Sequence, residues 1–178
     1  DLEETGARAG VNIPLTDTFA VRLDGSVRAR DGYITDLISG DDINKGLGNA
    51  NKILNRYLWI VNKQTDLRLH SFDGGNLRNA IPREANAVVS VPYSEKENVR
   101  VMLNQFIAEI ELELGETEPT IQITLESEQL PTTAVDKKTS DALLNTLYAC
   151  PHGVIAMSRD MPGLVETSTN LASIKMKP

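Results

Sequence analysis

The stretch ANAVVSVPYSEKENVRVMLNQFIAEIELELG, residues 85–115, decides the fold. Residues 85–91 place an apolar side chain at every second position, which is the period of a half-buried strand, and Pro92 ends that pattern. Large apolar residues then recur every three or four positions, and Gly115 follows as a helix-ending glycine. The stretch predicts a strand and then an amphipathic helix over residues 95–114. The large apolar residues of this helix are Val99, Met102, Leu103, Phe106, Ile107, Ile110 and Leu114.

The residues before this stretch predict a strand, a helix and a second strand. Residues 19–23 form a short apolar run, and the pair Asp24-Gly25 after it is typical of a turn. Apolar residues between Ala50 and Val61 follow helical spacing, and Asn49 can cap this helix by accepting hydrogen bonds from its first free amides. Residues 67–72 then indicate another strand, which ends at a glycine pair.

The residues after it predict one more strand and a C-terminal extension. Residues 121–125 alternate apolar and polar side chains, as a half-buried strand does. Apolar residues over 142–148 indicate a third helix that stops before Pro151, and residues 153–157 and 165–176 are two further strand-like runs.

The first six elements therefore run β-α-β-β-α-β, which is the ferredoxin-like order. We predict an α+β domain over residues 19–178, with an antiparallel sheet, helices on one face and an α-β-β extension that continues the sheet or lies against it. Residues 1–18 are set apart as an N-terminal segment.

Composition excludes several partners. The formal net charge is −7, which repels phosphate backbones and anionic lipid heads, so we expect neither nucleic acid nor membrane as a partner. No apolar run approaches the roughly 20 residues of a membrane helix. The single Cys150 cannot form an internal disulfide, which favours a cytoplasmic location.

The chain is poorly equipped for catalysis or metal binding. It has two histidines, His70 and His152, which are far apart and lack ligand-like neighbours. The acidic pairs Glu3-Glu4 and Asp41-Asp42 are interpreted as solvated charge. We expect His70 to be a structural residue of a strand and His152 to be exposed in a turn. No catalytic or metal-binding residue is predicted.

Two segments have both a structural and a functional interpretation. GLGNANK, residues 46–52, is typical of the glycine-rich start of a capped helix, although its free amides could also bind an anionic ligand. DGGNLRNAIPRE, residues 73–84, is typical of a plain turn, although the amide of Asn79 could also donate to a substrate oxygen.

Longer segments resemble the aminoacyl-histidine dipeptidases, also called Xaa-His dipeptidases or bacterial carnosinases, which are zinc-dependent peptidases. They are ISGDDINKGLGNANKIL (residues 38–54), DGGNLRNAIPREANAVV (73–89) and GLVETSTNLASIKM (163–176). ACPHGVIAMS (149–158) is similar to the matching run of the family. The resemblance extends from residue 19 to the last residue, in the order and spacing of the family.

The resemblance implies that the chain is the lid and dimerisation domain of such an enzyme. In the family the zinc ligands and the catalytic glutamate lie in flanking sequence, whose HxD motif is not found here. The resemblance therefore implies that the parent binds zinc, that this chain is inactive by itself, and that it forms a homodimer. Residues 1–6, DLEETG, are faintly similar to acidic motifs of the catalytic domain.

The resemblance also implies which residues lie near substrate. Asn79 matches the lid residue that contacts the substrate carbonyl or its tetrahedral intermediate. The other matching positions lie at the start of a helix and on a strand that returns toward the catalytic domain. They are Gly46, Gly48 and Asn49 at the helix, and Glu166, Thr167, Ser168 and Asn170 on the strand. From these, the substrate-binding set is predicted as Asn79, Asn49, Gly48 and Ser168.

One position departs from the family. The family has a substrate-binding histidine before the capped helix, whereas Ile38 stands there, followed by the matching pair Ser39-Gly40. The preceding SVRARDGYITDL, residues 26–37, also fits poorly. The alternative function is a ferredoxin-like regulatory or protein-interaction module without catalysis.

Overall fold

The computed structural model describes residues 18–27 and 46–176. The acidic pairs Glu3-Glu4 and Asp41-Asp42, Ile38, and the segments 1–6 and 28–37 lie outside these residues. The elements are β1 Thr18–Val27, α2 Ala50–Gln64, β2 Arg68–Gly74, β3 Glu84–Pro92, the 3-10 turn η1 Tyr93–Glu95, α3 Lys96–Leu114, β4 Ile121–Ser127, α4 Lys137–Ala149, β5 Gly153–Met157, β6 Val165–Thr169 and β7 Ile174–Met176.

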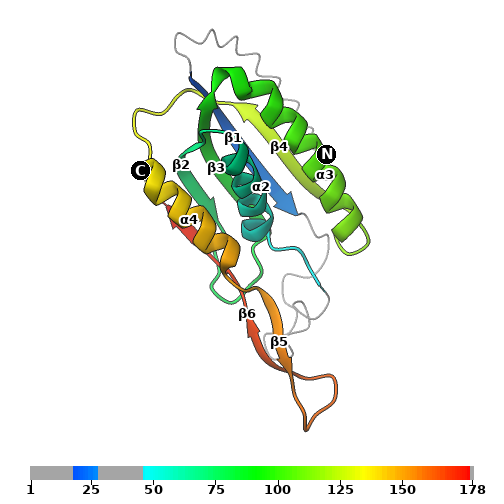
Figure 1. Cartoon of the computed structure of the whole chain (residues 1–178). Coiled ribbons are helices and arrows are strands. Elements are labelled where there is room, and N and C mark those ends of the chain that lie inside the picture. The colour runs from blue at the N-terminus through cyan, green and yellow to red at the C-terminus, as the bar shows by residue number, and fades with distance from the viewer. Residues whose placement is uncertain (1–17, 28–45, 177–178) are drawn as a thin grey trace, which may run out of the picture.

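The strands form a five-stranded antiparallel sheet in the order β4-β1-β3-β2-β7. Its first four strands have the ferredoxin-like order, and α2, α3 and α4 lie on one face (Figure 1). The predicted α+β fold is therefore confirmed. The extension contributes β7 to one edge of the sheet, whereas β5 and β6 form a separate hairpin that projects from the body (Figure 1).

Two boundaries differ from the sequence prediction. The pair Asp24-Gly25 does not end β1, because β1 is paired on both sides, with β3 and with β4, and the two ladders keep it extended through Val27. The run over residues 165–176 is not one strand. It is divided between β6, which pairs with β5, and β7, which pairs with β2.

The core lies between the sheet and the helices. The predicted apolar stripe of α3 packs into it, with five members buried and Ile107 and Leu114 partly buried. Tyr57 from α2 is also buried, and its hydroxyl donates to the carbonyl of Val99 at 2.8 Å. These α3 residues are therefore occupied by the domain's own core, and they leave little apolar surface for a partner.

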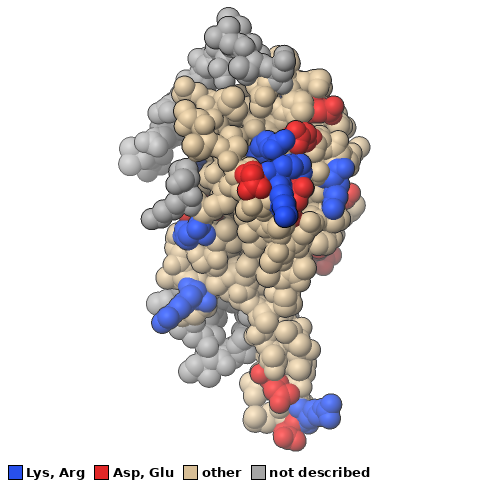
Figure 2. All heavy atoms as spheres, turned by 60° about the vertical axis from the view of Figure 1, so that its left-hand side comes forward, with Lys and Arg blue, Asp and Glu red and all other residues tan. Residues whose placement is uncertain are grey.

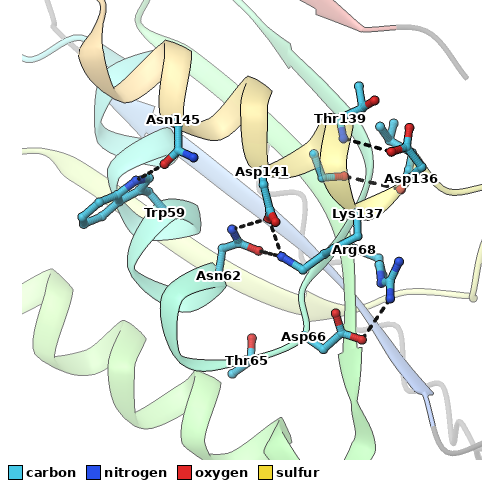
Figure 3. A network of polar contacts seen from close by, with 12 residues as sticks. Trp59, Asn62, Thr65, Asp66, Arg68, Asp136, Lys137, Thr139, Asp141 and Asn145 are labelled. Carbon is cyan, nitrogen blue, oxygen red and sulfur yellow. Dashed lines mark hydrogen bonds and ion pairs between the residues drawn. The ribbon is translucent and has the colours of Figure 1, made fainter.

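Polar contacts fasten α4 to α2 (Figure 3). The Asn62 amide donates to Asp141 at 2.8 Å, and Lys137 pairs with the same carboxylate and donates to Asn62. One turn away, the Trp59 indole donates to Asn145 at 2.8 Å. These contacts hold α4 beside α2.

His70 is a structural residue, as predicted. It is buried on β2, where its Nε2 contacts the Ser90 hydroxyl at 2.9 Å and its Nδ1 contacts the carbonyl of Thr133.

On the face shown in Figure 2, basic and acidic side chains lie beside one another rather than forming a broad area of one sign. Within the described residues, no helix is long and apolar enough to cross a membrane.

Candidate functional site

Segments far apart in the sequence meet at the first turn of α2. Asn49 precedes this helix, and its side chain contacts His152, Asn170 and Leu171. Asn170 in turn contacts the loop that carries Asn79. We call this cluster, made of Asn49, Asn51, His152 and Asn170, the asparagine junction. Its residues come from three of the four segments that carry the family resemblance, and the fourth, residues 73–89, supplies the Gly74 and Ala80 carbonyls that accept from Asn51 and Asn170.

Asn49 caps α2, as predicted. Its Oδ1 accepts from the backbone amide of Lys52 at 3.1 Å. The two hydrogens of its Nδ2 face three acceptors, namely Asn170 Oδ1 at 3.1 Å, the Leu171 carbonyl at 3.3 Å and His152 Nδ1 at 3.3 Å. Because the side chain is buried and engaged at both ends, its polar groups serve the domain's own structure.

Asn51 and Ala172 explain the glycine pair at the end of β2, Gly74 and Gly75. Asn51 is fully buried on α2, and its amide donates to the carbonyls of Leu171 and Gly74 at 3.1 and 3.4 Å. A Cβ on Gly74 would come within 1.9 Å of its Oδ1, and a Cβ on Gly75 would come within 2.0 Å of the Ala172 carbonyl oxygen. Both glycines are needed because helix and connection approach the strand too closely for a side chain.

Gly48 is held by a partly buried ion pair between Arg83 and Glu118. Its backbone amide donates to Glu118 Oε1 at 3.0 Å, and its carbonyl accepts from Arg83 Nη1 at 3.3 Å. Arg83 also donates to both carboxylate oxygens of Glu118, at 2.7 and 2.6 Å. The backbone before α2 is thereby joined to the residues before β3 and β4.

His152 is half-buried in the junction, so the expectation that it is exposed is wrong. Because Asn49 presents only an amide donor, His152 Nδ1 accepts, and neutral imidazole carries its proton on Nε2. Burial, followed by the nearby charge of Lys52, lowers the pKa of His152. Lys52 itself donates to the carbonyls of Leu147, Tyr148 and Cys150 at the end of α4, at 2.9, 2.8 and 2.7 Å.

The predicted substrate-binding residues fall into two groups. Asn79 is exposed in the loop between β2 and β3, and Ser168 is exposed on β6, two positions before Asn170. Asn49 and Gly48 are instead buried, with their polar groups satisfied inside the domain. The structure therefore leaves the side chains of Asn79 and Ser168 accessible to another molecule.

Sequence reasoning did not single out three residues of this region, Asn51, Arg83 and Glu118, and it gave His152 no role. The sequence does contain one indication of these contacts. Two asparagines, Asn51 and Asn55, lie on the otherwise apolar face of α2. A polar side chain on a buried helix face needs a hydrogen-bond partner, and Asn55 finds one in the Leu144 carbonyl of α4 at 3.1 Å. Such a pair predicts polar contacts with neighbouring elements.

The donor set of the described residues does not suit zinc. No three His, Cys, Asp or Glu side chains within residues 18–27 and 46–176 gather closely enough to hold a metal ion. A zinc site needs several such ligands on one ion.

Sheet order and helix placement define a ferredoxin-like α+β domain. Residues 39–118 match the family described as the peptidase dimerisation domain. The chain is 40% identical to the cytosol non-specific dipeptidase of Escherichia coli (strain K12) over 138 residues. These residues are 78% of this chain and 28% of that protein. It also matches the crystal structure of aminoacylhistidine dipeptidase from Vibrio alginolyticus, with a TM-score of 0.82, 32% identity, and coverage of 93% of this chain and 32% of that one.

The family match and both relatives agree that the chain is similar to a peptidase dimerisation domain. The resemblance to this dipeptidase group, stated from the motif segments, is thereby confirmed. The chain spans about a third or less of the length of the two relatives, at 28% and 32%.

Proposed function

We propose that this domain works as the dimerisation domain and substrate-covering lid of a zinc-dependent dipeptidase that hydrolyses Xaa-His dipeptides such as carnosine. The observation that carries the proposal is the asparagine junction. The segments shared with aminoacyl-histidine dipeptidases converge there, and the exposed Asn79 lies on the adjoining loop. The Vibrio alginolyticus relative of the same fold is named an aminoacylhistidine dipeptidase.

Asn79 has the chemistry for the central role. Its side-chain amide can donate a hydrogen bond that strengthens as a peptide carbonyl becomes an oxyanion. Ser168, exposed on β6, can supply a second polar contact. We assign Asn49 and Gly48 to the shape of the site, because their polar groups are engaged within the domain and their backbone borders the junction.

The zinc ion of the parent is proposed to be bound by residues outside this chain, and it would polarise the scissile carbonyl there. This chain by itself is then inactive, and its contribution is to bind and orient substrate. We also propose that the parent is cytosolic, as the Escherichia coli relative is named a cytosol dipeptidase.

Self-association is proposed to use one side of the domain. β4 is an edge strand of the sheet, so its outer backbone groups can pair with a second copy. On α3, four exposed residues recur with spacings of four, three and four, which places them on one stripe. They are Val101, Gln105, Ala108 and Leu112. A two-fold pairing of edge and stripe would form a homodimer that buries roughly 1,200–2,000 Å².

The test is hydrolysis of carnosine and Gly-His by the parent polypeptide, with zinc, and by this chain. We expect turnover by the parent and none by the chain. Asn79→Ala in the parent should lower kcat by about 10²–10³-fold. Tightly bound zinc with real turnover in this chain would contradict the proposal. A parent that has zinc-binding flanks but hydrolyses no dipeptide would favour the alternative, a ferredoxin-like regulatory or interaction module.

A further inference from the structure

We propose that Asn170 is a positioning residue that holds the Asn79 loop in place through a directed relay of side-chain amides. The relay runs from the cap of α2 through Asn49 and Asn170 to the carbonyl of Ala80, the residue directly after Asn79. Its consequence for catalysis rests on the function proposed above for Asn79.

The helix cap fixes the orientation of the Asn49 side-chain amide. An asparagine side chain could place its oxygen or its nitrogen at either position, but only the oxygen can accept from a backbone amide. Asn49 Oδ1 accepts from the Lys52 amide at 3.1 Å, which is the capping bond of α2. The Nδ2 hydrogens must therefore point out of the helix, toward Asn170.

The orientation of the Asn170 side-chain amide follows from that of Asn49. Since Asn49 presents hydrogens, Asn170 must present its Oδ1, and the two atoms lie 3.1 Å apart. The Nδ2 of Asn170 then faces away from α2 and donates to the Ala80 carbonyl at 2.7 Å. The direction of the helix cap is thus passed through two amides to the loop, and neither amide can flip without losing a bond.

The loop that carries Asn79 has few packing contacts to hold it in place. The side chains from Asn76 to Asn79 are exposed, so packing does little to hold them. The loop backbone is anchored at its two ends, where the Gly75 amide donates to the Glu84 carbonyl and the Pro82 carbonyl accepts from Ala50. The bond from Asn170 falls between these anchors, next to the residue whose amide must be aimed.

Two substitutions separate the two halves of the relay. Asn170→Asp keeps an oxygen for Asn49 but has no hydrogen for the Ala80 carbonyl, whereas Asn170→Ala removes both bonds. Ser173→Ala is the matched control, because Ser173 lies in the same connection and its hydroxyl donates to a different carbonyl, that of Gly75, at 3.0 Å. We expect all three variants to keep the circular dichroism spectrum of the wild-type chain.

The first readout is amide hydrogen exchange in the 178-residue chain, which does not depend on activity. The Ala80 amide donates to the Leu77 carbonyl at 3.5 Å, and we expect Asn170→Asp and Asn170→Ala to speed its exchange by about tenfold, the loss of one hydrogen bond, while Ser173→Ala leaves it unchanged. Wild-type exchange of the Ala80 amide in both Asn170 variants would overturn the proposal.

The second readout is dipeptide hydrolysis by the parent polypeptide. Asn170→Asp should lower kcat about tenfold with a smaller change in KM, and it should lower kcat no further when Asn79→Ala is already present. Multiplicative losses in the double variant would show that Asn170 does not act through Asn79. Wild-type turnover in Asn79→Ala would contradict the proposed function instead, and the exchange rates would then decide the positioning by themselves.

Discussion

Arg83 and Glu118 form a two-pronged ion pair beneath the start of α2, with Nη1–Oε1 and Nη2–Oε2 distances of 2.7 and 2.6 Å. Only 3% of the Glu118 side chain is exposed, and the same carboxylate also accepts from the Gly48 amide. Three segments separated in sequence are therefore joined by one carboxylate. The pair holds in place the backbone that leads into the capping residue Asn49.

Removing this carboxylate should destabilise the domain strongly. In Glu118→Ala the Arg83 guanidinium and the Gly48 amide lose their shared acceptor while remaining partly or fully buried. Leaving a buried charge unpaired costs about 3 kcal/mol in the free energy of unfolding. Asp66→Ala, which breaks the exposed Asp66–Arg68 pair, is the control and should change it by less than about 0.5 kcal/mol. Urea denaturation measures both, and equal effects would contradict the structural role of Glu118.

Gly75→Ala should be far more costly than Gly163→Ala. Both glycines have a positive φ, 71° and 85°, so alanine at either position carries a backbone penalty of about 1–2 kcal/mol. A Cβ on Gly75 would also lie 2.0 Å from the Ala172 carbonyl oxygen, whereas nothing lies within 4 Å of one on Gly163. We expect Gly75→Ala to lower the free energy of unfolding by about 2 kcal/mol more than Gly163→Ala. Equal losses on thermal or urea unfolding would show that β2 and the connection to β7 do not approach this closely.

Stability should fall in mildly acidic solution because of His152. Its pKa is lowered in the folded chain by burial and by Lys52, so the unfolded chain binds the proton more readily. The stabilisation is complete above the usual histidine pKa of about 6.5 and is lost as the pH falls below it. His152→Asn removes the titrating group and leaves His70 in the sequence. It should flatten the dependence of unfolding free energy on pH between about 7.5 and 5.5. The same slope in both proteins would contradict the buried, neutral state of His152.

Leu112→Glu should dissociate the proposed dimer without unfolding the domain. Leu112 is 90% exposed on the outer stripe of α3, so a glutamate there costs the isolated domain little but places a charge inside the pairing surface. Ile155→Glu is the control, because Ile155 is 58% exposed on the β5–β6 hairpin, away from β4. We expect a monomer for the first variant and an unchanged mass for the second in light scattering. A dimeric Leu112→Glu protein would exclude the α3 stripe from the interface.

The fold was largely predictable because periodicity in sequence reports burial within one element. The α3 stripe and the Asn49 cap depend on residues three or four positions apart, so the local pattern contains them. The extension of β1 through Asp24-Gly25 was not predictable in this way. That pair favours a turn locally, and only the ladders formed with β3 and β4 override the preference.

The candidate site was predictable only in part, for the same physical reason. Asn49 and Asn170 are 121 positions apart, and Gly48 and Glu118 are 70 apart, so no local spacing indicates that they meet. In the sequence, the glycine pair at the end of β2 is typical of a turn. Its cause is the close approach of Asn51 and Ala172, which only the packed domain creates.

The central claim, that this chain is a dimerisation domain which pairs with a second copy of itself, is tested most directly by its mass in solution. Multi-angle light scattering should be recorded from about one to one hundred micromolar. We predict a mass that rises with concentration toward twice the 19.5 kDa of the chain. A mass that stays at 19.5 kDa over the whole range would contradict the account.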